Sequence, residues 1–454
     1  MKKVAQLLFL TFLLIGNYSL NLSAQHVKHQ AGPMLGYVEH MEVGIWYQTK
    51  TEASVQLLYW KKSDPKKVFK TETIEVSAEE YFIAKFVLVN LDFGTDFEYQ
   101  VSVDSKILKF DYPLQFTTQD LWQWRKDAPD FTVAMGSCLY VNDPPQDRPG
   151  KPYGASPQII ESIADKKPNV MLWTGDNLYY RETDFYSKTR MDYRNKEVRS
   201  LKVMQRLLAT AANYATWDDH DFGPNNSDRS YKYKDETLKL FNSYWFNPGA
   251  GEVDNKGVYF DFKYNDIDFI LLDDRYHRAP NDLIDSSKTF FGKKQFTWLK
   301  DRLLNSSAPF KIVINGNQTI NANNPYEGFN HYYNEQKELI DFIKKQKIEG
   351  VVFFSGDRHH TELLKLEQAE MYPLYEFTNS PLTSGYNAYL SENELKNPLR
   401  IKGTLVDSTQ NFGMMKVFGP RKNRSITLQT FDPKGKLIWE HTINESELKF
   451  KSVK

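Results

Sequence analysis

Short runs in which hydrophobic and polar residues alternate fill the first quarter of the chain. They cover residues 41–49, 53–60, 82–91, 97–104 and 114–118. Turn-forming sequences such as KSDPKK and DFGTDF separate these runs. Alternation of this kind is typical of half-buried strands. The pattern therefore predicts a small antiparallel β-sandwich of immunoglobulin or fibronectin type over residues 25–118, followed by a linker over 119–130.

After residue 130 the pattern changes to helices that alternate with strands. Helices are expected at 156–168, with Ser156 as N-cap, and at 201–211, 292–307 and 334–346. Strands are expected at 131–138, 169–177, 310–318 and 349–360, and a hairpin is expected to join 257–264 to 267–278. This order predicts an α/β domain over residues 131–454. A chain of 454 residues also exceeds the usual size of one hydrophobic core.

Ligand-type side chains stand directly after the carboxyl ends of these predicted strands. They are Cys138, Asp176, the Asp218–Asp221 run, Asn317 with Gln318, and Asp357 with His359 and His360. The carboxyl ends of parallel strands meet at one edge of an α/β sheet, where ligands bind. We therefore expect these side chains to form one site.

The first 24 residues have the features of a signal peptide. Lys2 and Lys3 precede an apolar run over 4–15, and Ala24 offers a small residue for cleavage. That run is too short to span a membrane comfortably, and no other long apolar segment follows. We expect an exported protein, located in the periplasm, at the cell surface or in the medium.

Charge and cysteine content narrow the possible functions. Loss of Lys2 and Lys3 from the 58 basic residues leaves 56 against 58 acidic ones, a net charge of about −2 that argues against a nucleic-acid-binding module. Cys138 is the single cysteine. In an oxidising compartment an unpaired thiol must be buried, paired between chains, or held by a metal or a reaction.

Six short motifs, taken in order, resemble those of PhoD-type alkaline phosphatases, a branch of the metallophosphatase superfamily. They are GSC, GDNLYYR, WDDHDFGPNN, LLDDRYHR, NGNQ and SGDRHH, and residues 32–49 resemble the opening of that family's N-terminal β-domain. The resemblance implies a four-layer α-β-β-α catalytic domain. It also implies hydrolysis of phosphate esters, diesters included, by a metal-activated water. We expect a monomer that acts on a small-molecule or polymeric phosphate ester.

The donor types predict two metal ions. A thiolate (Cys138), a carboxylate (Asp176), a phenolate (Tyr179) and an imidazole (His359) suit Fe(III). The second ion would share Asp176 and take further oxygen donors from Asp219, Asp357 and Asn226. Oxygen donors favour Ca²⁺, Mn²⁺ or Mg²⁺. A pair of Zn²⁺ ions is less favoured, because Asp stands where the wider superfamily has Asn and His. Zn²⁺ stays an alternative for the second ion, and the sequence leaves open which Asp or Asn within 219–226 is the donor.

The resemblance and the charges also suggest residues that act on the substrate. His220 matches the superfamily histidine that contacts the phosphate or the leaving group. Arg181, five residues after Asp176, is placed to clamp the phosphate, as Arg275 or Arg278 could be. His360 is a further candidate for substrate binding.

Two other functions compete with this interpretation. A cysteine-dependent phosphatase needs an arginine shortly after its nucleophile, and Pro144 stands at that position. A non-catalytic binding protein on the same scaffold would tolerate lost ligands, whereas each expected position carries a plausible donor. Hydrolysis of a chromogenic phosphomonoester with and without a chelator separates the alternatives.

Overall fold

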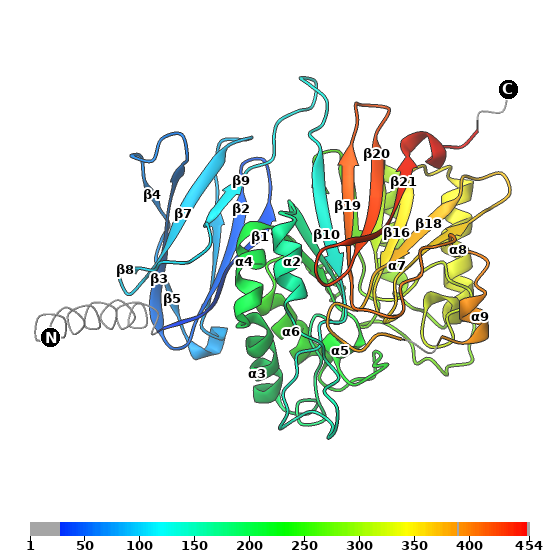
Figure 1. The fold of residues 1–454 in the computed structure, drawn as a ribbon, viewed down its shortest axis with the longest axis horizontal. Coiled ribbons are helices and arrows are strands. Elements are labelled where there is room, and N and C mark those ends of the chain that lie inside the picture. Colours follow the sequence, from blue (N-terminus) through cyan, green and yellow to red (C-terminus); the bar gives the residue numbers. More distant parts are fainter. Residues whose placement is uncertain (1–27, 388–389, 452–454) are drawn as a thin grey trace, which may run out of the picture.

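The computed structural model describes residues 28–387 and 390–451. The predicted signal peptide, residues 1–24, lies outside these ranges. Figure 1 shows a β-lobe at the left of the molecule, formed by the N-terminal part of the chain, beside a larger α/β lobe. In the part of the chain that the structure describes, no helix has the length and apolar character needed to cross a membrane.

Two antiparallel sheets build the β-lobe. One has the order β1-β2-β6, and the other has the order β4-β3-β7-β8 with β5 beside β3 and β9 beside β7. Buried side chains of both sheets, such as Ile45, Leu57 and Val101, belong to one hydrophobic cluster. The bounds are β1 His29–Val38, β2 Val43–Thr49, β3 Ala53–Lys61, β4 Phe69–Lys70, β5 Ile74–Val76, β6 Ile83–Leu88, β7 Asp96–Val103, β8 Lys106–Ile107 and β9 Gln115–Thr117. The relation to immunoglobulin or fibronectin domains stays a prediction.

Two six-stranded sheets form the centre of the α/β lobe. Their orders are β12-β11-β10-β19-β20-β21 and β13-β14-β15-β16-β18-β17. Strands β10, β11 and β12 are parallel, as are β14, β15, β16 and β18. The bounds are β10 Phe131–Gly136, β11 Val170–Thr174, β12 Ala212–Thr216, β13 Phe260–Tyr264, β14 Ile267–Leu271, β15 Lys311–Ile314, β16 Val351–Ser355, β17 Glu362–Leu366, β18 Leu374–Thr378, β19 Phe412–Phe418, β20 Ser425–Phe431 and β21 Leu437–Asn444. The predicted hairpin is confirmed, because β13 and β14 pair antiparallel.

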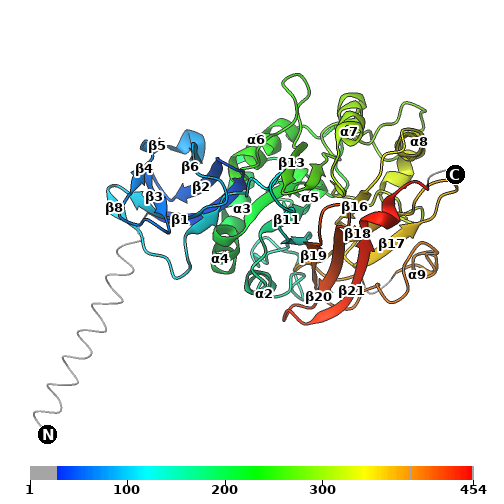
Figure 2. The ribbon, with the colours of Figure 1, turned by 90° about the horizontal axis from the view of Figure 1, so that it is seen from above.

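Helices cover the outer faces of the two sheets. Figures 1 and 2 show α2, α3 and α4 between the first sheet and the β-lobe, and α7 with α8 on the far side of the second sheet. The bounds are α2 Ile159–Asp165, α3 Lys188–Arg199, α4 Lys202–Thr210, α5 Asp219–Phe222, α6 Lys234–Tyr244, α7 Lys293–Asn305, α8 Tyr333–Lys345 and α9 Glu392–Leu395. The prediction that Ser156 caps the first helix is wrong, because α2 begins later and its N-cap is Gln158.

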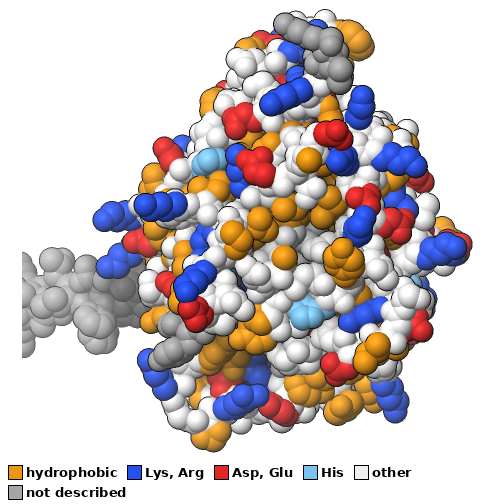
Figure 3. All heavy atoms as spheres, turned by 90° about the vertical axis from the view of Figure 1, so that its right-hand side faces the viewer, with side chains coloured by type: hydrophobic (Ala, Val, Ile, Leu, Met, Phe, Trp, Pro, Cys, Tyr) orange, Lys and Arg blue, Asp and Glu red, His pale blue; other side chains and the backbone are white. Residues whose placement is uncertain are grey.

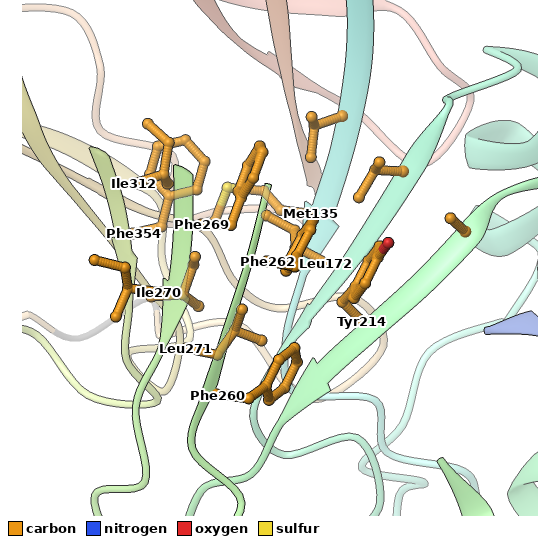
Figure 4. Close-up of a cluster of buried hydrophobic side chains, with 14 of the residues drawn as sticks. Met135, Leu172, Tyr214, Phe260, Phe262, Phe269, Ile270, Leu271, Ile312 and Phe354 are labelled. Atoms are coloured by element: carbon orange, nitrogen blue, oxygen red, sulfur yellow. The ribbon is translucent and has the colours of Figure 1, made fainter. Parts of the chain in front are cut away.

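Aromatic and aliphatic side chains fill the space between the two sheets (Figure 4). The ring of Tyr214 on β12 stacks on Phe262 of β13 with centroids 3.6 Å apart, and Phe262 stacks on Phe269 of β14 at 4.8 Å. Burying each such side chain contributes roughly 2–3 kcal/mol. This core fixes the two sheets against each other, so the loops at their ends have fixed relative positions.

The β-lobe is attached to the α/β lobe through β1. The Gly32 amide donates to Gln205 on α4 over 2.7 Å, and Asn213 of β12 donates to the Leu35 carbonyl over 2.9 Å. Lys85 of β6 donates from Nζ to the carbonyls of Asn242 and Trp245. These polar contacts cross a buried boundary and hold the lobes in one arrangement.

On another face, the right-hand side of Figure 1, basic and acidic side chains are interspersed (Figure 3).

Candidate metal centre

Loops that follow strands of both sheets meet at one end of the α/β lobe. Five candidate ligands on these loops have left-handed backbone conformations: Cys138 (φ 61°), Asp176 (52°), Asn226 (60°), Asp357 (63°) and His359 (54°). Such conformations cost roughly 1–3 kcal/mol each for residues with a side chain, and they concentrate at functional sites. Contacts with the surrounding fold therefore stabilise backbone conformations that are unfavourable for these residues by themselves.

Glycines let the strand ends approach closely. Gly175 has φ +92°, and a Cβ added there would lie 2.7 Å from Asp218 Cβ. A Cβ added at Gly356 would lie 2.5 Å from Ser137 Oγ. The glycine in each Gly-Asp pair is thus required for packing, because it brings Asp176 from one sheet toward Asp357 from the other.

Four predicted donors lie together beside the first sheet. Ligand atoms of Cys138, Asp176 and His359 all lie within 4.8 Å of one another. The Tyr179 hydroxyl donates to Asp176 Oδ2 over 3.0 Å and lies 3.2 Å from His359 Nε2. Cys138 Sγ lies 3.7 Å from the same Asp176 oxygen. A thiol, a carboxylate, a phenol and an imidazole thus converge on one point.

A second donor group adjoins the first and shares Asp176. Ligand atoms of Asp176, Asp219 and His220 lie within 4.8 Å of one another. Asp219 Oδ2 accepts the Asn226 amide over 2.6 Å. Among the residues that the structure describes, buried Asp219 Oδ1 and Asp357 Oδ2 have no hydrogen-bond partner. Buried carboxylate oxygens without partners are costly, and a cation would satisfy both, so the donors present fit a metal ion.

Asn226 supports this group mainly through its backbone. Its amide is the one that binds Asp219, whereas its side-chain oxygen accepts from Asn225 over 2.9 Å. Both asparagines line the opening that contains Asp176 and Asp357. The structure therefore brings Asn226 to the site, and its side chain as a metal ligand stays a prediction.

Carboxylates crowd this centre, and their pKa values reflect it. Burial, reinforced by Asp219, Asp221 and Asp357, raises the pKa of Asp176 well above its usual range. Burial raises the pKa of Asp357 to about 7. Burial acts in the same direction on Asp219, but the charges of His220 and Arg275 outweigh it and lower that pKa to about 2. A bound cation reverses the direction for the crowded acids because it favours their ionised forms.

Burial also raises the pKa values of the two other acidic donors, the Cys138 thiol and the Tyr179 phenol. Burial, with the charge of Asp176 next in importance, raises the pKa of both the Cys138 thiol and the Tyr179 phenol well above the usual values. Neither group ionises readily in these surroundings without a nearby positive charge. A metal ion supplies that charge, because coordination deprotonates a thiol outright.

His359 is oriented by Tyr153, a residue that sequence reasoning missed. The Tyr153 hydroxyl lies 3.0 Å from His359 Nδ1, which leaves Nε2 facing Tyr179. Burial lowers the pKa of His359 to about 4, so the imidazole is neutral and can offer a lone pair. A hydrogen bond on the other ring nitrogen commonly orients a ligating histidine. Nothing in the sequence around Tyr153 signals this contact.

His220 lies at the mouth of the site. Its ring packs against Tyr179 in a tilted arrangement with centroids 4.1 Å apart, and its Nε2 lies 4.0 Å from Asp219 Oδ2. Its amide donates to Asp176 Oδ1 over 3.2 Å. The side chain is 22% exposed and lines the opening, and burial lowers its pKa. Its contact with the substrate phosphate stays a prediction.

The prediction that Arg275 or Arg278 clamps the phosphate disagrees with the structure. Both side chains are fully buried. Arg275 pairs with Asp218 and, over 2.9 Å, with Glu327. Arg278 donates to Asn281 over 2.8 Å and to the Glu327 carbonyl over 2.6 Å. Their guanidinium groups neutralise buried acids behind the centre instead of facing the open side.

The direct substrate contacts predicted for Arg181 and His360 also need correction. The Arg181 nitrogens donate to Asp147 over 2.9 Å and to the carbonyls of Val141 and Tyr179. His360 is 1% exposed, and its Nδ1 lies 3.0 Å from the Arg358 carbonyl. Arg181 still lines the neighbouring hollow, so it positions the Tyr179 loop without a free edge for a phosphate.

Glu327 and Arg358 are cleft residues that the sequence analysis left out. Both line the opening with Asp357 and His359. Arg358 pairs with Glu394, and its buried Nε has no partner among the residues described by the structure. Its place between two predicted ligands in SGDRHH could have identified it. Glu327 stands in a loop without a recognisable motif, so only the fold reveals it.

Comparisons with known proteins agree with this architecture. The sequence profile of the PhoD-like phosphatase family matches residues 152–423, and that of a domain of unknown function (DUF7800) matches residues 27–119. Alkaline phosphatase D of Bacillus subtilis (strain 168) is 24% identical over 284 residues, which are 50% of this chain and 48% of the relative. The chain thus matches about half the length of that curated relative.

Two solved structures share the fold. A structure titled as that of PhoD superposes with a TM-score of 0.75 at 16% identity, covering 94% of this chain and 92% of the other. A purple acid phosphatase, PPD1 from yellow lupin seeds, superposes with a TM-score of 0.64 at 11% identity, covering 92% of this chain and 75% of the other. At these identities the likeness concerns the fold, and it covers both lobes.

Proposed function

We propose that this chain, which belongs to the PhoD-like phosphatase family, hydrolyses phosphate esters at the centre that Asp176 bridges. The observation that carries the proposal is that Asp176 belongs to both donor groups, one with Cys138 and His359 and one with Asp219 and His220. A carboxylate shared in this way can hold two ions a short distance apart. Such pairs stabilise the attacking and leaving oxygens of phosphoryl transfer.

The donor chemistry assigns a different ion to each group. Fe(III) suits the first, formed by Cys138, Asp176, Tyr179 and His359, because thiolate and phenolate favour a strongly Lewis-acidic ion. For the second ion we propose the oxygens of Asp176, Asp219, Asp357 and Asn226 as donors, which suit Ca²⁺, with Mn²⁺, Mg²⁺ or Zn²⁺ as alternatives. His220, the third member of the second donor group, is left to contact the substrate. When bound, the ions would activate a water and neutralise the charge of the phosphate.

The chain's own residues contact the substrate and hold the metal ligands in position. His220, at the mouth of the site, offers a ring N–H as a hydrogen-bond donor to the phosphate or the leaving oxygen. Tyr153 holds His359 in its ligating orientation through the 3.0 Å contact. Arg181 positions the Tyr179 loop, and Arg275 holds Asp218 behind the centre. The natural partner is a small-molecule or polymeric phosphate ester, and the protein acts as an exported monomer.

A non-catalytic binding protein is the competing interpretation. Asp219 Oδ1 and Asp357 Oδ2, carboxylate oxygens of the cleft without a hydrogen-bond partner in the described part of the chain, count against it, because an unused site would be expected to lose such unfavourable groups. The deciding experiment follows hydrolysis of p-nitrophenyl phosphate and bis(p-nitrophenyl) phosphate by the mature protein. We expect turnover at neutral to alkaline pH that a strong chelator removes and added Ca²⁺ and iron restore. Turnover that is unchanged by the chelator would contradict the metal mechanism. Absence of turnover of both esters after metal loading would favour the non-catalytic binding protein.

A further inference from the structure

A second hollow continues sideways from the metal centre. It has a volume of about 680 Å³ and shares Tyr153, His220 and Asn225 with the opening, of about 440 Å³, that contains Asp176. Its walls come from the segments 140–153 and 179–185. We call this hollow the side arm. A phosphate bound at Asp176 would direct one of its substituents into the side arm.

Tyrosine rings form the inner wall of the side arm. The ring of Tyr140 lies 4.8 Å from that of Tyr153 and 5.1 Å from that of Tyr179, measured between centroids. The Arg181 guanidinium covers Tyr140 at 3.9 Å, and the Tyr140 hydroxyl donates to Asp147 over 2.8 Å. The rings are therefore fixed before a ligand arrives. Fixed aromatic rings bind planar groups with little loss of side-chain entropy.

Two exposed cations, Arg148 and Lys151, line the outer part of the side arm. The Arg148 side chain is 91% exposed and lies 3.6 Å from Glu182, which is itself 65% exposed. A pair so open to solvent contributes little and is easily exchanged. The other nearby acid, Asp147, is occupied by Tyr140 and Arg181. Positive charge is thus available at the rim for a ligand.

Building on the proposed function, we propose that the side arm is a substrate subsite for a ring-bearing substituent with a second anionic group. The phosphate lies at the Asp176 centre, the ring stacks against the exposed ring of Tyr153, and the distal anion meets Arg148 and Lys151. The substrate class is therefore a phosphate ester of an aromatic or other planar group that carries a further carboxylate or phosphate. An ester with a small neutral alkyl group would leave the side arm empty.

Phosphonates test the subsite, because their P–C bond is not hydrolysed. We would measure the dissociation constants of methylphosphonate, phenylphosphonate and 4-phosphonobenzoate for the metal-loaded protein by calorimetry. The phenyl ring should tighten binding about three- to tenfold over methyl. The carboxylate should add about threefold more. Arg148→Ala/Lys151→Ala should lose the gain from the carboxylate and keep the affinity for methylphosphonate.

A matched charge control is Lys434→Ala/Lys436→Ala, which removes two exposed lysines outside both hollows. This control should retain the gain from the carboxylate. Equal affinities for the methyl and phenyl compounds, or a carboxylate gain that survives in Arg148→Ala/Lys151→Ala, would overturn the subsite while leaving the proposed function intact. Failure of all three phosphonates to bind after metal loading would instead count against the metal centre itself, and the subsite would fall with it.

Discussion

The Tyr179 hydroxyl lies 3.0 Å from Asp176 Oδ2, the oxygen that Cys138 Sγ also approaches at 3.7 Å. The loop after β11 therefore carries both Asp176, the carboxylate proposed to bridge two ions, and a phenol that faces the same point as the chain's single thiol. The proposed ferric ion at this point would therefore be detectable by visible absorption. A phenolate and a thiolate both donate charge to a ferric ion, and such complexes are coloured.

Tyr179→Phe should shift or bleach a visible absorption band of the purified protein while leaving the fold intact, because only one hydroxyl is removed. Cys138→Ser should perturb the same band and lower the iron content, since the soft ligand is lost. The matched variant His220→Ala should keep both colour and iron yet lose turnover. Visible spectra and elemental analysis of identically prepared samples make the comparison. An unchanged band in both ligand variants would exclude these two residues from the iron site.

Asp176→Asn should abolish most of the activity, because one carboxylate serves both donor groups. Losing electrostatic stabilisation at such a position costs on the order of 10²–10³ in rate, and loss of the ions adds to this. The measurements are kcat for a chromogenic diester and the metal content of the same sample. Near-normal turnover with normal metal content would rule out the bridging role.

Arg275→Met should destabilise the protein by about 3–5 kcal/mol, since Asp218 and Glu327 would remain buried without their cation. Denaturant unfolding measures this, with the exposed Arg148→Ala as the comparison, which should change the unfolding free energy by less than about 0.5 kcal/mol. KM of the folded fraction should stay near the wild-type value. A stable Arg275→Met protein with a strongly raised KM would restore the substrate role that the buried geometry argues against.

Lys85 should give the boundary between the lobes a pH dependence. Burial lowers its pKa from 10.5 to about 8. Between these values the unfolded state binds more protons than the folded state, so the free energy of unfolding rises with pH. Relative to Lys85→Met, the wild type should gain about 2–3 kcal/mol between pH 8 and pH 10.5. Lys66→Met, at an exposed lysine of the same lobe, should leave that slope unchanged, and an equal slope in Lys85→Met would contradict the assignment.

Hydrophobic periodicity predicted helices and strands whose burial pattern is visible in the local sequence. The amphipathic pattern over 334–346 corresponds to α8, and the alternation over 53–60 corresponds to β3. No element was predicted after residue 360, so β17 to β21 were missed, including the antiparallel strands that complete the first sheet. In the first sheet β19 pairs with β10, and in the second sheet β18 pairs with β16. The pairing of β19 with β10 joins segments far apart in sequence, so no local pattern encodes it.

The same limit applies to the site. Cys138, Asp176, Tyr179 and His359 could be found because each follows a strand or lies in a short motif, and the structure brings them together. Sequence position could not show which way the arginines face. Arg275 is drawn inward by Asp218, a partner 57 positions earlier in the chain. The positive charge of Arg275 therefore suggested a phosphate clamp, whereas the fold places this side chain in a buried ion pair with Asp218.

The metal content of the active wild-type protein tests the central claim most directly. Elemental analysis of the mature protein, purified without added metal or chelator, should find about one iron and about one hard divalent ion, Ca²⁺ in the first instance, per chain. Activity should be lost when a chelator removes these ions and should recover when the ions are added back. A fully active protein without iron and without a divalent ion would contradict the two-ion centre and leave Cys138 as a buried thiol with no assigned role.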